Sequence, residues 1–492
     1  MSEAGAGMTP AQREHSRRWV ILAILGLAQL MVVLDATIVN IALPSAQADL
    51  GFSDANRQWI ITAYALAFGS LLLFGGRLSD LLGRKWVFMW GLVGFAVASA
   101  IGGLAQDFTI LVTARALQGV FGALLAPAAL SLLTTTFTDV KERGKAFGIY
   151  GAIAGAGGAL GLLLGGVLTE YLSWRWCLWV NLILAIPAAI GALVLLVHRG
   201  RGDASLDIPG TVTSVLGLLA LVYGFTRAES DGWTAGITIS LLVAAVILLA
   251  LFVWIEIRAP EPMLPMRVLL DRNRGGAYLG LTLASAALFG VFLFLTYYLQ
   301  ATLGYSPVTT GLAFLPMIGT IMLTATTSTA LILPRTGPRL PITIGMLLGA
   351  VGLVLLTQIG VDTPYATHVL PGLLVTGLGL GLVFACSFEV GTTGVRSDDA
   401  GVASAMVNTT QQVGGSIGTA LLSTIFASAV TASIAASSTP RAPGTQAVAQ
   451  VDGYITAFWW SAAIFLAAAV VCGLLMTSQR PEGTPDAPPV PV

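Results

Sequence analysis

Charged side chains are scarce in this chain, which excludes most classes of soluble protein. Lys, Arg, Asp and Glu make up 10% of its 492 residues, whereas a soluble protein carries about 25%. Long apolar runs take their place: 56% of the residues are hydrophobic and the mean hydropathy is +0.85. Because a helix needs about 20 apolar residues to cross a bilayer, the sequence predicts an all-α polytopic membrane protein.

Cysteine and histidine are also rare, so the chain has few residues that could form a metal centre or a redox site. The three cysteines, Cys177, Cys386 and Cys472, lie in or beside apolar runs without CxxC or metal-ligand spacing. They are interpreted as thiols that face lipid or the protein core. There are three histidines, and neither an HExxH motif nor a phosphate-binding loop is present. We therefore expect no cofactor, no metal, no enzymatic activity and no nucleic-acid partner.

Apolar windows between polar or Gly/Pro-rich breaks predict fourteen membrane spans. Arginines precede the first span, as in a signal peptide, but its apolar run is too long for one, so we interpret it as an uncleaved anchor. The predicted spans are residues 19–43, 58–78, 86–106, 108–137, 146–169, 176–197, 208–226, 235–255, 275–301, 308–333, 340–361, 369–391, 400–430 and 454–477.

The distribution of Lys and Arg predicts the orientation of these spans. With the amino terminus inside, 19 of the 24 basic residues fall in cytoplasmic segments, four fall outside and Arg115 lies within a span. Basic residues accumulate on the cytoplasmic side of membrane proteins. We therefore expect a multi-pass protein of the plasma (cell) membrane with both termini in the cytoplasm.

The two strongest interruptions, at 198–209 and 258–274, flank spans seven and eight and divide the helices 6+2+6. Similar loops follow span two and span ten, at 80–85 and 334–339. This echo indicates two related halves, which in transporters place a site near the midplane at their interface. The predicted parts are a cytoplasmic tail (1–18), a six-helix bundle (19–197), an inserted helix pair with linkers (198–274), a second six-helix bundle (275–478) and a disordered tail (479–492).

Asp35 is an acid within the first span, where an ionisable group costs roughly 2.5–3.5 kcal/mol. It lies eight residues from the outer end of its span, and Arg115 lies seven residues from the outer end of span four. At 1.5 Å per residue these depths are roughly 12 Å and roughly 10 Å, so the two charges are natural partners. The pair is either structural or a proton-coupling site. We favour the second because Asp35 is the only deep acid in the first half.

The loop after span two carries glycines and charges at the spacing G-x-x-x-D-x-x-G-R-K. Glycines let helices approach closely, and Asp80 suits the positive amino end of a neighbouring helix. Ordinary positive-inside charge is the alternative. We predict a conformational gate that comprises Gly76, Asp80, Gly83, Arg84 and Lys85.

Span five carries glycines at four-residue intervals, which place small residues on one helix face. Such a face permits intimate helix contact, and it serves either simple packing or a surface that slides or bends during transport. The predicted motif comprises Gly157, Gly158, Gly161, Gly165 and Gly166.

Polar and aromatic residues of the second half are candidates for a substrate cavity. Asn408 and Gln412 share a polar stripe that faces protein or a cavity, and Tyr297 belongs to an aromatic group that faces lipid or a pocket. Glu389 is interfacial if span twelve stops before it and a membrane carboxylate if the span continues; we include it among the proton-coupling residues. The predicted cavity comprises Asn40, Gln118, Tyr297, Asn408 and Gln412.

Together these motifs resemble those of the fourteen-helix drug:proton antiporter family of the major facilitator superfamily. The resemblance covers nearly the whole chain. It implies the major facilitator fold, with Asp35 as the proton-coupling carboxylate, Arg115 as its partner, the Asp80 loop as a latch of the outward-open state and span five as the antiporter motif. It rests on residues 34–44, 76–85, Arg115 with Gln118 and Gly119, 173–176 with Asn181, 206–210, and 401–404 with Asn408.

The chain departs from the family pattern at three places. Gly161-Leu162 stands where the family has a Gly-Pro pair, and Asn181-Leu182-Ile183 stands where it has Asn-x-Pro. Span thirteen lacks the acids of some relatives. We therefore expect a neutral or singly charged lipophilic substrate.

The predicted function is export of hydrophobic drugs, antibiotics or secondary metabolites from the cytoplasm in exchange for protons, by alternating access. The expected partners are protons, this small lipophilic substrate and membrane lipid, and the expected state is a monomer. The first alternative is an exporter of lipids or cell-envelope precursors on the same scaffold. A membrane-embedded enzyme or sensor is the remote alternative.

Overall fold

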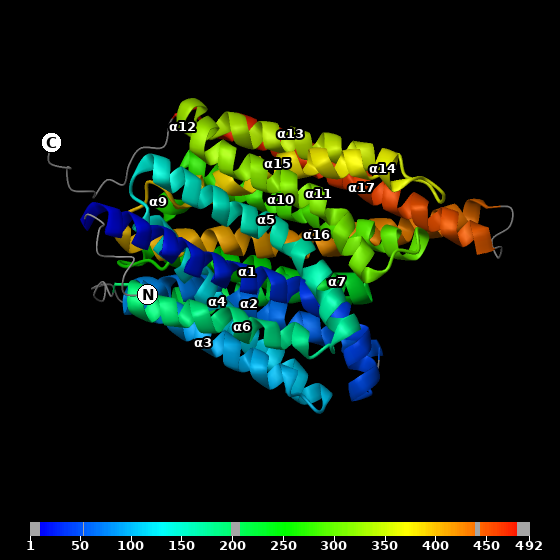
Figure 1. The fold of residues 1–492 in the computed structure, drawn as a ribbon, viewed down its shortest axis with the longest axis horizontal. Helices are drawn as coiled ribbons and strands as arrows, with labels where there is room; N and C mark the ends of the chain where they lie inside the picture. The colour runs from blue at the N-terminus through cyan, green and yellow to red at the C-terminus, as the bar shows by residue number, and fades with distance from the viewer. Residues whose placement is uncertain (1–9, 53, 198–206, 438–442, 480–492) are drawn as a thin grey trace.

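The computed structural model describes residues 10–52, 54–197, 207–437 and 443–479, and every regular element in these ranges is a helix (Figure 1). Thirteen of the described helices are long and apolar enough to cross a membrane, and α5 passes the same test as a bent pair of segments. The fourteen spans predicted from the apolar windows are therefore present as helices, and the all-α polytopic fold is confirmed.

Eight spanning helices make up the first part of the chain. The first six are α1 (Pro10–Leu50), α2 (Asp54–Leu82), α3 (Arg84–Gly103), α4 (Phe108–Thr136), α5 (Val140–Tyr171) and α6 (Trp176–Leu195). The predicted inserted pair corresponds to α7 (Ile208–Asp231) and α8 (Gly236–Arg258).

Six spanning helices and several short turns make up the second part. The spanning helices are α10 (Arg272–Tyr297), α11 (Pro307–Thr327), α13 (Arg339–Leu356), α15 (Leu370–Thr392), α16 (Ala400–Ala436) and α17 (Pro443–Leu475). The short elements are α9 (Met266–Leu269), the π-helical turns η1 (Tyr298–Thr302) and η2 (Ser328–Ile332), α12 (Leu333–Thr336), α14 (Tyr365–His368) and the 3-10 turn η3 (Ser397–Asp399).

The spanning helices pack in two groups that meet along two seams. Helices α1 to α6 contact one another and are called the N bundle; α10, α11, α13, α15, α16 and α17 do likewise and are called the C bundle. In Figure 1 the C bundle lies mostly above the N bundle. One seam joins α2 and α4 to α16, and the other joins α5 to α11 and α15. Helix α7 packs on α8 and on both α2 and α16, so the inserted pair lies along the first seam. The domain limits themselves stay predictions, since 198–206 lies outside the described residues.

The start of α1 and the end of α17 lie at the same end of the molecule, which is called the inner end (Figure 1). Basic side chains cap helix carboxyl ends there: Arg17 donates to Leu195 O of α6 over 2.6 Å, and Arg272 donates to Leu475 O of α17 over 3.1 Å. Cations at this position bind the free carbonyls of the last turn and offset the helix dipole.

The two loops that the sequence pairs as an echo contain the same kind of turn. Gly83 lies just before α3 with φ +93°, and Gly337 lies just before α13 with φ +69°. This left-handed region favours glycine, because a Cβ atom would clash with the backbone. The equivalent turns support the interpretation of two related halves.

Helix α5 bends by 50° between the segments Lys141–Gly155 and Leu160–Tyr171. No proline lies in this helix, so the bend does not depend on the Gly-Pro pair of the family pattern. Gly155, Gly157 and Gly158 lie at the bend, where glycine lowers the cost of departing from helical geometry. The bent helix belongs to the N bundle and runs along the C bundle.

Candidate functional site

Asp35 lies on α1 with its side chain fully buried inside the N bundle. Its Oδ2 atom is 2.5 Å from Nη1 of Arg115 on α4, whose side chain is 2% exposed. The depths predicted from sequence thus bring the two charges into direct contact. Opposite charges in this geometry offset much of the cost of removing each from water.

Two amide side chains complete the shell around this carboxylate. Gln118 Nε2 on α4 and Asn181 Nδ2 on α6 donate to Asp35 Oδ1 over 2.8 and 2.9 Å. The same two nitrogens lie 2.7 and 3.2 Å from Ser99 Oγ on α3. Both carboxylate oxygens therefore receive N–H donors.

Arg115 is held in place by two contacts with α2. Its Nε donates to Ile60 O over 3.3 Å, and its guanidinium carbon lies 4.4 Å from the ring centroid of Tyr64. A cation over an aromatic face is attracted by the ring quadrupole. The guanidinium is thus oriented from two sides, so neutralising Asp35 would leave a fixed, buried cation without its counter-charge.

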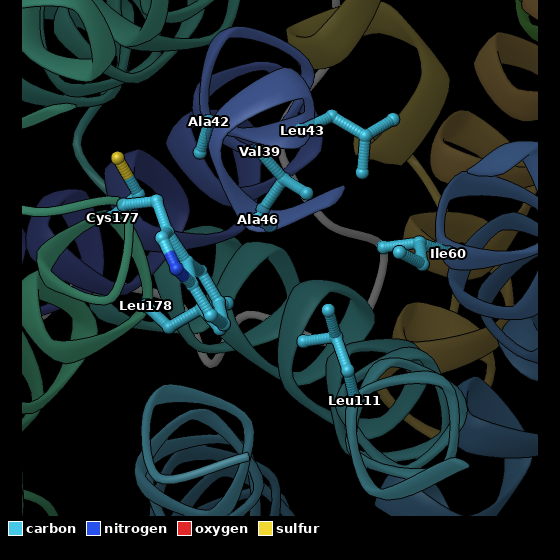
Figure 2. Close-up of a pocket in the computed structure, with 9 residues that line it drawn as sticks. Val39, Ala42, Leu43, Ala46, Ile60, Leu111, Cys177 and Leu178 are labelled. Atoms are coloured by element: carbon cyan, nitrogen blue, oxygen red, sulfur yellow. The ribbon is translucent and has the colours of Figure 1, made fainter. Parts of the chain in front are cut away.

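A small apolar pocket lies on the outer side of this cluster (Figure 2). Val39 follows Asp35 by one turn on α1, and Leu111 precedes Arg115 by one turn on α4. The cavity has a volume of about 10 Å³, whereas a buried water needs about 10–15 Å³ and two to four polar partners. A dry layer therefore closes the outer side of the cluster, and we call its residues the apolar plug: Val39, Ala42, Leu43, Ala46, Ile60, Leu111, Trp174, Cys177 and Leu178.

The outer rim of the apolar plug is tied by polar contacts. Trp174 Nε1 donates to Asp49 Oδ2 over 3.0 Å, and Arg175 pairs with the same carboxylate oxygen. The hydrogen bond from Arg175, followed by that from Trp174, holds the pKa of Asp49 below its ordinary value. Arg175 also donates to Ala105 O over 2.9 Å, which links the ends of α1, α3 and α6 at this rim.

The predicted gate residues lie at the inner end of the seam between α2 and α16. Asp80 accepts hydrogen bonds from the backbone N–H groups of Gly401 and Val402, at 3.0 and 3.3 Å, and pairs with Arg84 at 3.3 Å. At Gly76 a Cβ atom would lie 2.6 Å from Gly401 O, so only glycine allows this approach. The carboxylate therefore sits at the positive amino end of a C-bundle helix, as the loop pattern predicts.

Two further gate residues have local roles in this conformation. Gly83 supplies the left-handed turn before α3. Lys85 points to the end of α6 instead of α16, and donates to Leu193 O and Leu196 O over 3.0 and 2.7 Å. Lys85 thus caps α6 in this conformation, whereas Asp80 makes the contact with α16.

The glycines of α5 face several helices at close range. A Cβ atom at Gly157 would lie 2.5 Å from a methyl carbon of Val33, and one at Gly161 would overlap the Thr37 hydroxyl. Gly165 contacts α1 as well, Gly158 faces Phe292 of α10, and Gly166 is buried. The four-residue stripe therefore packs on the helix that carries Asp35.

The residues predicted for the substrate cavity are dispersed. Gln118 is fully buried in the Asp35 cluster and Tyr297 is 50% exposed on α10. Asn408 and Gln412 are half-buried on α16, where Asn408 donates to Ser404 O over 2.9 Å and Gln412 meets Gly69 of α2. The side chain of Asn40 lies outside the described part of the structure. The arrangement puts the α16 stripe, but not Gln118, at the surface between the bundles.

Glu389 lies within α15, which continues to Thr392, and its side chain is 2% exposed. It is therefore a carboxylate buried inside the protein, three residues before the end of the helix. Its partner is Arg143 of α5, at 3.5 Å. Glu389 therefore belongs to the seam between α5 and α15 and not to the Asp35 cluster inside the N bundle.

Sequence reasoning missed Ser99, Arg143 and the contact of Asn181 with Asp35. Ser99 and Asn181 are polar residues in apolar windows, which is a usable signal, but depth alone does not show which face of a helix they occupy. Arg143 belongs to a cluster of basic residues in a predicted loop. Such residues are usually exposed, so its burial was not predicted.

In the described part of the chain, two contacting six-helix bundles and an inserted helix pair, with an ion pair buried inside one bundle, have the architecture of a multi-pass membrane transporter. A sequence model described as Major Facilitator Superfamily matches residues 25–419. The chain belongs to this superfamily.

Relatives and a solved structure agree with this assignment. The chain is 49% identical to the puromycin resistance protein of Streptomyces alboniger, covering 95% of this chain and 93% of that protein. It is 38% identical to the cephamycin export protein of Amycolatopsis lactamdurans, covering 88% and 90%. It is 35% identical to the tetracenomycin C resistance and export protein of Streptomyces glaucescens, covering 87% and 79%. Among solved structures, the human organic anion transporter MFSD10 matches in fold with a TM-score of 0.63 at 15% identity, covering 94% of this chain and 100% of that one.

Proposed function

We propose that this chain is a proton-coupled antiporter that exports hydrophobic drugs, antibiotics or secondary metabolites from the cytoplasm by alternating access. The observation that carries the proposal is the fully buried Asp35 carboxylate, paired with Arg115 at 2.5 Å and enclosed by amide donors. Structural stability alone does not require such a cluster, since apolar residues of the same volume are often as stable as a buried ion pair.

Proton coupling follows if the charge of Asp35 differs between the two ends of the cycle. In the conformation described, three side chains donate N–H groups to the carboxylate. Protonation would remove the counter-charge of Arg115 and weaken the shell, which favours a rearranged conformation. Without such a difference in proton affinity between states, a proton gradient could not drive substrate movement.

The available driving force is sufficient for drug export. A proton that moves inward releases roughly 2.3 kcal/mol per 100 mV of membrane potential, and each pH unit adds roughly 1.4 kcal/mol. A tenfold substrate gradient also corresponds to roughly 1.4 kcal/mol, so one or two protons sustain gradients of tens- to thousands-fold.

Helix α5 links Asp35 to the movement of the bundles. Its glycine stripe packs on Val33 and Thr37, which flank Asp35 on α1, while the same helix forms a seam with α11 and α15. A change in the packing of α1 around Asp35 is therefore transmitted to a surface between the bundles. Asp80, at the amino end of α16, closes the inner end of the other seam.

We propose that the inner end lies in the cytoplasm, because 19 of the 24 basic residues belong to segments on that side. The plasma membrane is the proposed location. The substrate is a neutral or singly charged lipophilic molecule, which fits the absence of acidic residues from the sequence of α16. The relatives named for puromycin, cephamycin and tetracenomycin C support small antibiotics as the substrate class.

Antiport in liposomes tests this proposal. Purified protein is reconstituted with a pH gradient, and proton release driven by added drug is measured together with drug movement. We expect drug-dependent proton movement in the wild type and its loss in Asp35→Asn. Asp362→Asn is the matched control, since this aspartate is exposed in the loop before α14.

Two outcomes would contradict the proposal. Unchanged drug-dependent proton release in Asp35→Asn would exclude coupling through this residue. Translocation of a labelled lipid, with no movement of any drug in a panel, would favour the alternative of a lipid or envelope-precursor exporter.

A further inference from the structure

The inner third of α5 packs against the C bundle so closely that backbones touch. A Cβ atom at Gly144 would lie 2.5 Å from Thr329 O, and one at Gly151 would lie 2.6 Å from Ala385 Cα. Thr329 also donates its hydroxyl to Gly144 O. Only glycine fits at these two positions, so the seam is closed here by backbone contact. Any opening of the inner side has to separate these surfaces.

One ion pair is buried at the inner end of this seam. Arg143 Nε of α5 lies 3.5 Å from Glu389 Oε1 of α15, and the side chains are 4% and 2% exposed. Within the described residues, Arg143 Nε and Nη2 and Glu389 Oε2 have no hydrogen-bond partner. The pair therefore joins the two bundles by charge attraction and not by a saturated hydrogen-bond network.

Aromatic side chains pack beside the segment of α15 that carries Glu389. Phe388, next to Glu389, has an edge contact with the ring of Tyr150 at a centroid distance of 6.1 Å. The Tyr150 hydroxyl is directed to Gln29 of α1, with a hydrogen bond of 2.8 Å, and so does not serve Glu389. A charge left without its partner in this environment would be costly, because water cannot replace the lost interaction.

We propose that Arg143 and Glu389 form an electrostatic lock that holds the α5/α15 seam shut and becomes hydrated when the inner side opens. The proposal rests on the alternating access of the proposed function. With the contact of Asp80 on α16, each of the two seams then has one electrostatic closure at its inner end. Glu389 thereby becomes a positioning residue of the gate, which differs from the proton-coupling role predicted from sequence.

The incomplete bonding of the pair suits a lock that must release. Closure brings two charges out of water, and the imperfect geometry leaves their attraction only slightly larger than that cost. The closed and open states can then remain close in free energy. A fully hydrogen-bonded pair would favour the closed state more strongly.

Distance measurements between spin labels on the two bundles test the lock. Lys141 of α5 and Arg335 of α12 are exposed near the inner end of the seam, and each is replaced by a labelled cysteine. The three native cysteines are replaced by alanine, and the full chain is studied in lipid nanodiscs by double electron–electron resonance. The ratio of short to long distances reports the closed and open states.

Single and double variants give opposite expectations. Glu389→Gln and Arg143→Gln each leave an unsatisfied buried group, so each should lower the ratio of closed to open molecules by at least about tenfold. The charge exchange Arg143→Glu with Glu389→Arg keeps an ion pair and should return the ratio towards that of the wild type. The double variant Arg143→Gln with Glu389→Gln has neither an ion pair nor an unpaired charge, so its ratio should lie between those of the single variants and the wild type. Glu142→Gln is the control, since Glu142 pairs with His15 and Arg18 inside the N bundle.

The lock is wrong if both single variants keep the wild-type distances, if the double Gln variant is as closed as the wild type, or if the charge exchange is as open as the single variants. A second measurement separates gating from proton transfer: the number of protons moved per substrate should be unchanged in Glu389→Gln. A lower number with unchanged distances would return Glu389 to the proton pathway. Failure of the proposed function would instead appear in the wild type, as transport without protons, and would leave the distance results as they are.

Discussion

Asp80 and Gly401 are 321 positions apart in the chain, yet the carboxylate of the first accepts a hydrogen bond from the backbone N–H of the second over 3.0 Å. The acceptor belongs to α2 of the N bundle and the donor to the first turn of α16 in the C bundle. The N–H groups of a first turn have no partner within their own helix, and the helix dipole favours an anion there. This contact can form only while the inner ends of the two bundles are together.

Replacing Asp80 by asparagine should therefore favour the inner-open state. The substitution keeps the size of the side chain but removes the charge, and an anion at a helix amino end contributes about 1–2 kcal/mol in partly buried geometry. The ratio of closed to open molecules should fall about 5- to 30-fold, as measured by spin-label distances between the inner ends of α2 and α16. Glu14→Gln is the control, since Glu14 is exposed on α1 at the same end and pairs only with Arg18 among the contacts described. An unchanged distance distribution in Asp80→Asn would remove this residue from the gate.

Asn181 should be needed for full transport activity, because it holds the Asp35 carboxylate by a hydrogen bond inside the N bundle. Asn181→Ala removes this donor, and a hydrogen bond to a charged group contributes about 1.5–3 kcal/mol. Drug-dependent proton release in liposomes should therefore fall by roughly tenfold or more. Ser99→Ala, which removes no donor from Asp35, should lower the release less. Wild-type release in Asn181→Ala, or equal losses in the two variants, would contradict this role.

Gly161 and Thr37 should behave as a coupled pair. In Gly161→Ala the new methyl group would overlap the Thr37 hydroxyl, so α1 and α5 must move apart and transport should fall about tenfold or more. Adding Thr37→Ala removes the overlapping oxygen and should restore most of the activity. Gly319→Ala is the control, because nothing lies within 4 Å of a Cβ atom at that position in α11. Drug efflux rates in vesicles measure the effect, and a double variant no better than Gly161→Ala would show that steric overlap is not the cause.

The sequence predicts the spans and the Asp35–Arg115 contact well because both depend on position along a helix. Apolar windows report membrane depth, and two charges at one depth in a bundle are expected to meet. Which face a residue occupies depends on how the helices pack, and so the approach of Asn181 and Ser99 to Asp35 was not predictable. The same limit applies to Lys85, whose charge belongs to the gate motif but which caps α6.

Contacts between the bundles are the least predictable part of the site. Arg143 and Glu389 are separated by half of the chain, and nothing in either local sequence indicates the other. The bend of α5 without a proline is a further case, since glycines permit a bend but do not require one. By contrast, the acceptor role of Asp80 at a helix amino end was predictable. The free N–H groups at a helix amino end are strong partners for a short acidic side chain in a glycine-rich turn.

Under the proposed mechanism, the shell of N–H groups around Asp35 would also select the coupling ion. A metal cation binds where several oxygen atoms converge, but both carboxylate oxygens here are occupied by nitrogen donors, one of them a guanidinium. Sodium would meet positive charge and no vacant oxygen cage, whereas a proton needs one lone pair. A sodium gradient should therefore be unable to replace the proton gradient as the driving force. If the protein confers drug resistance, that resistance should depend on external pH and not on external sodium.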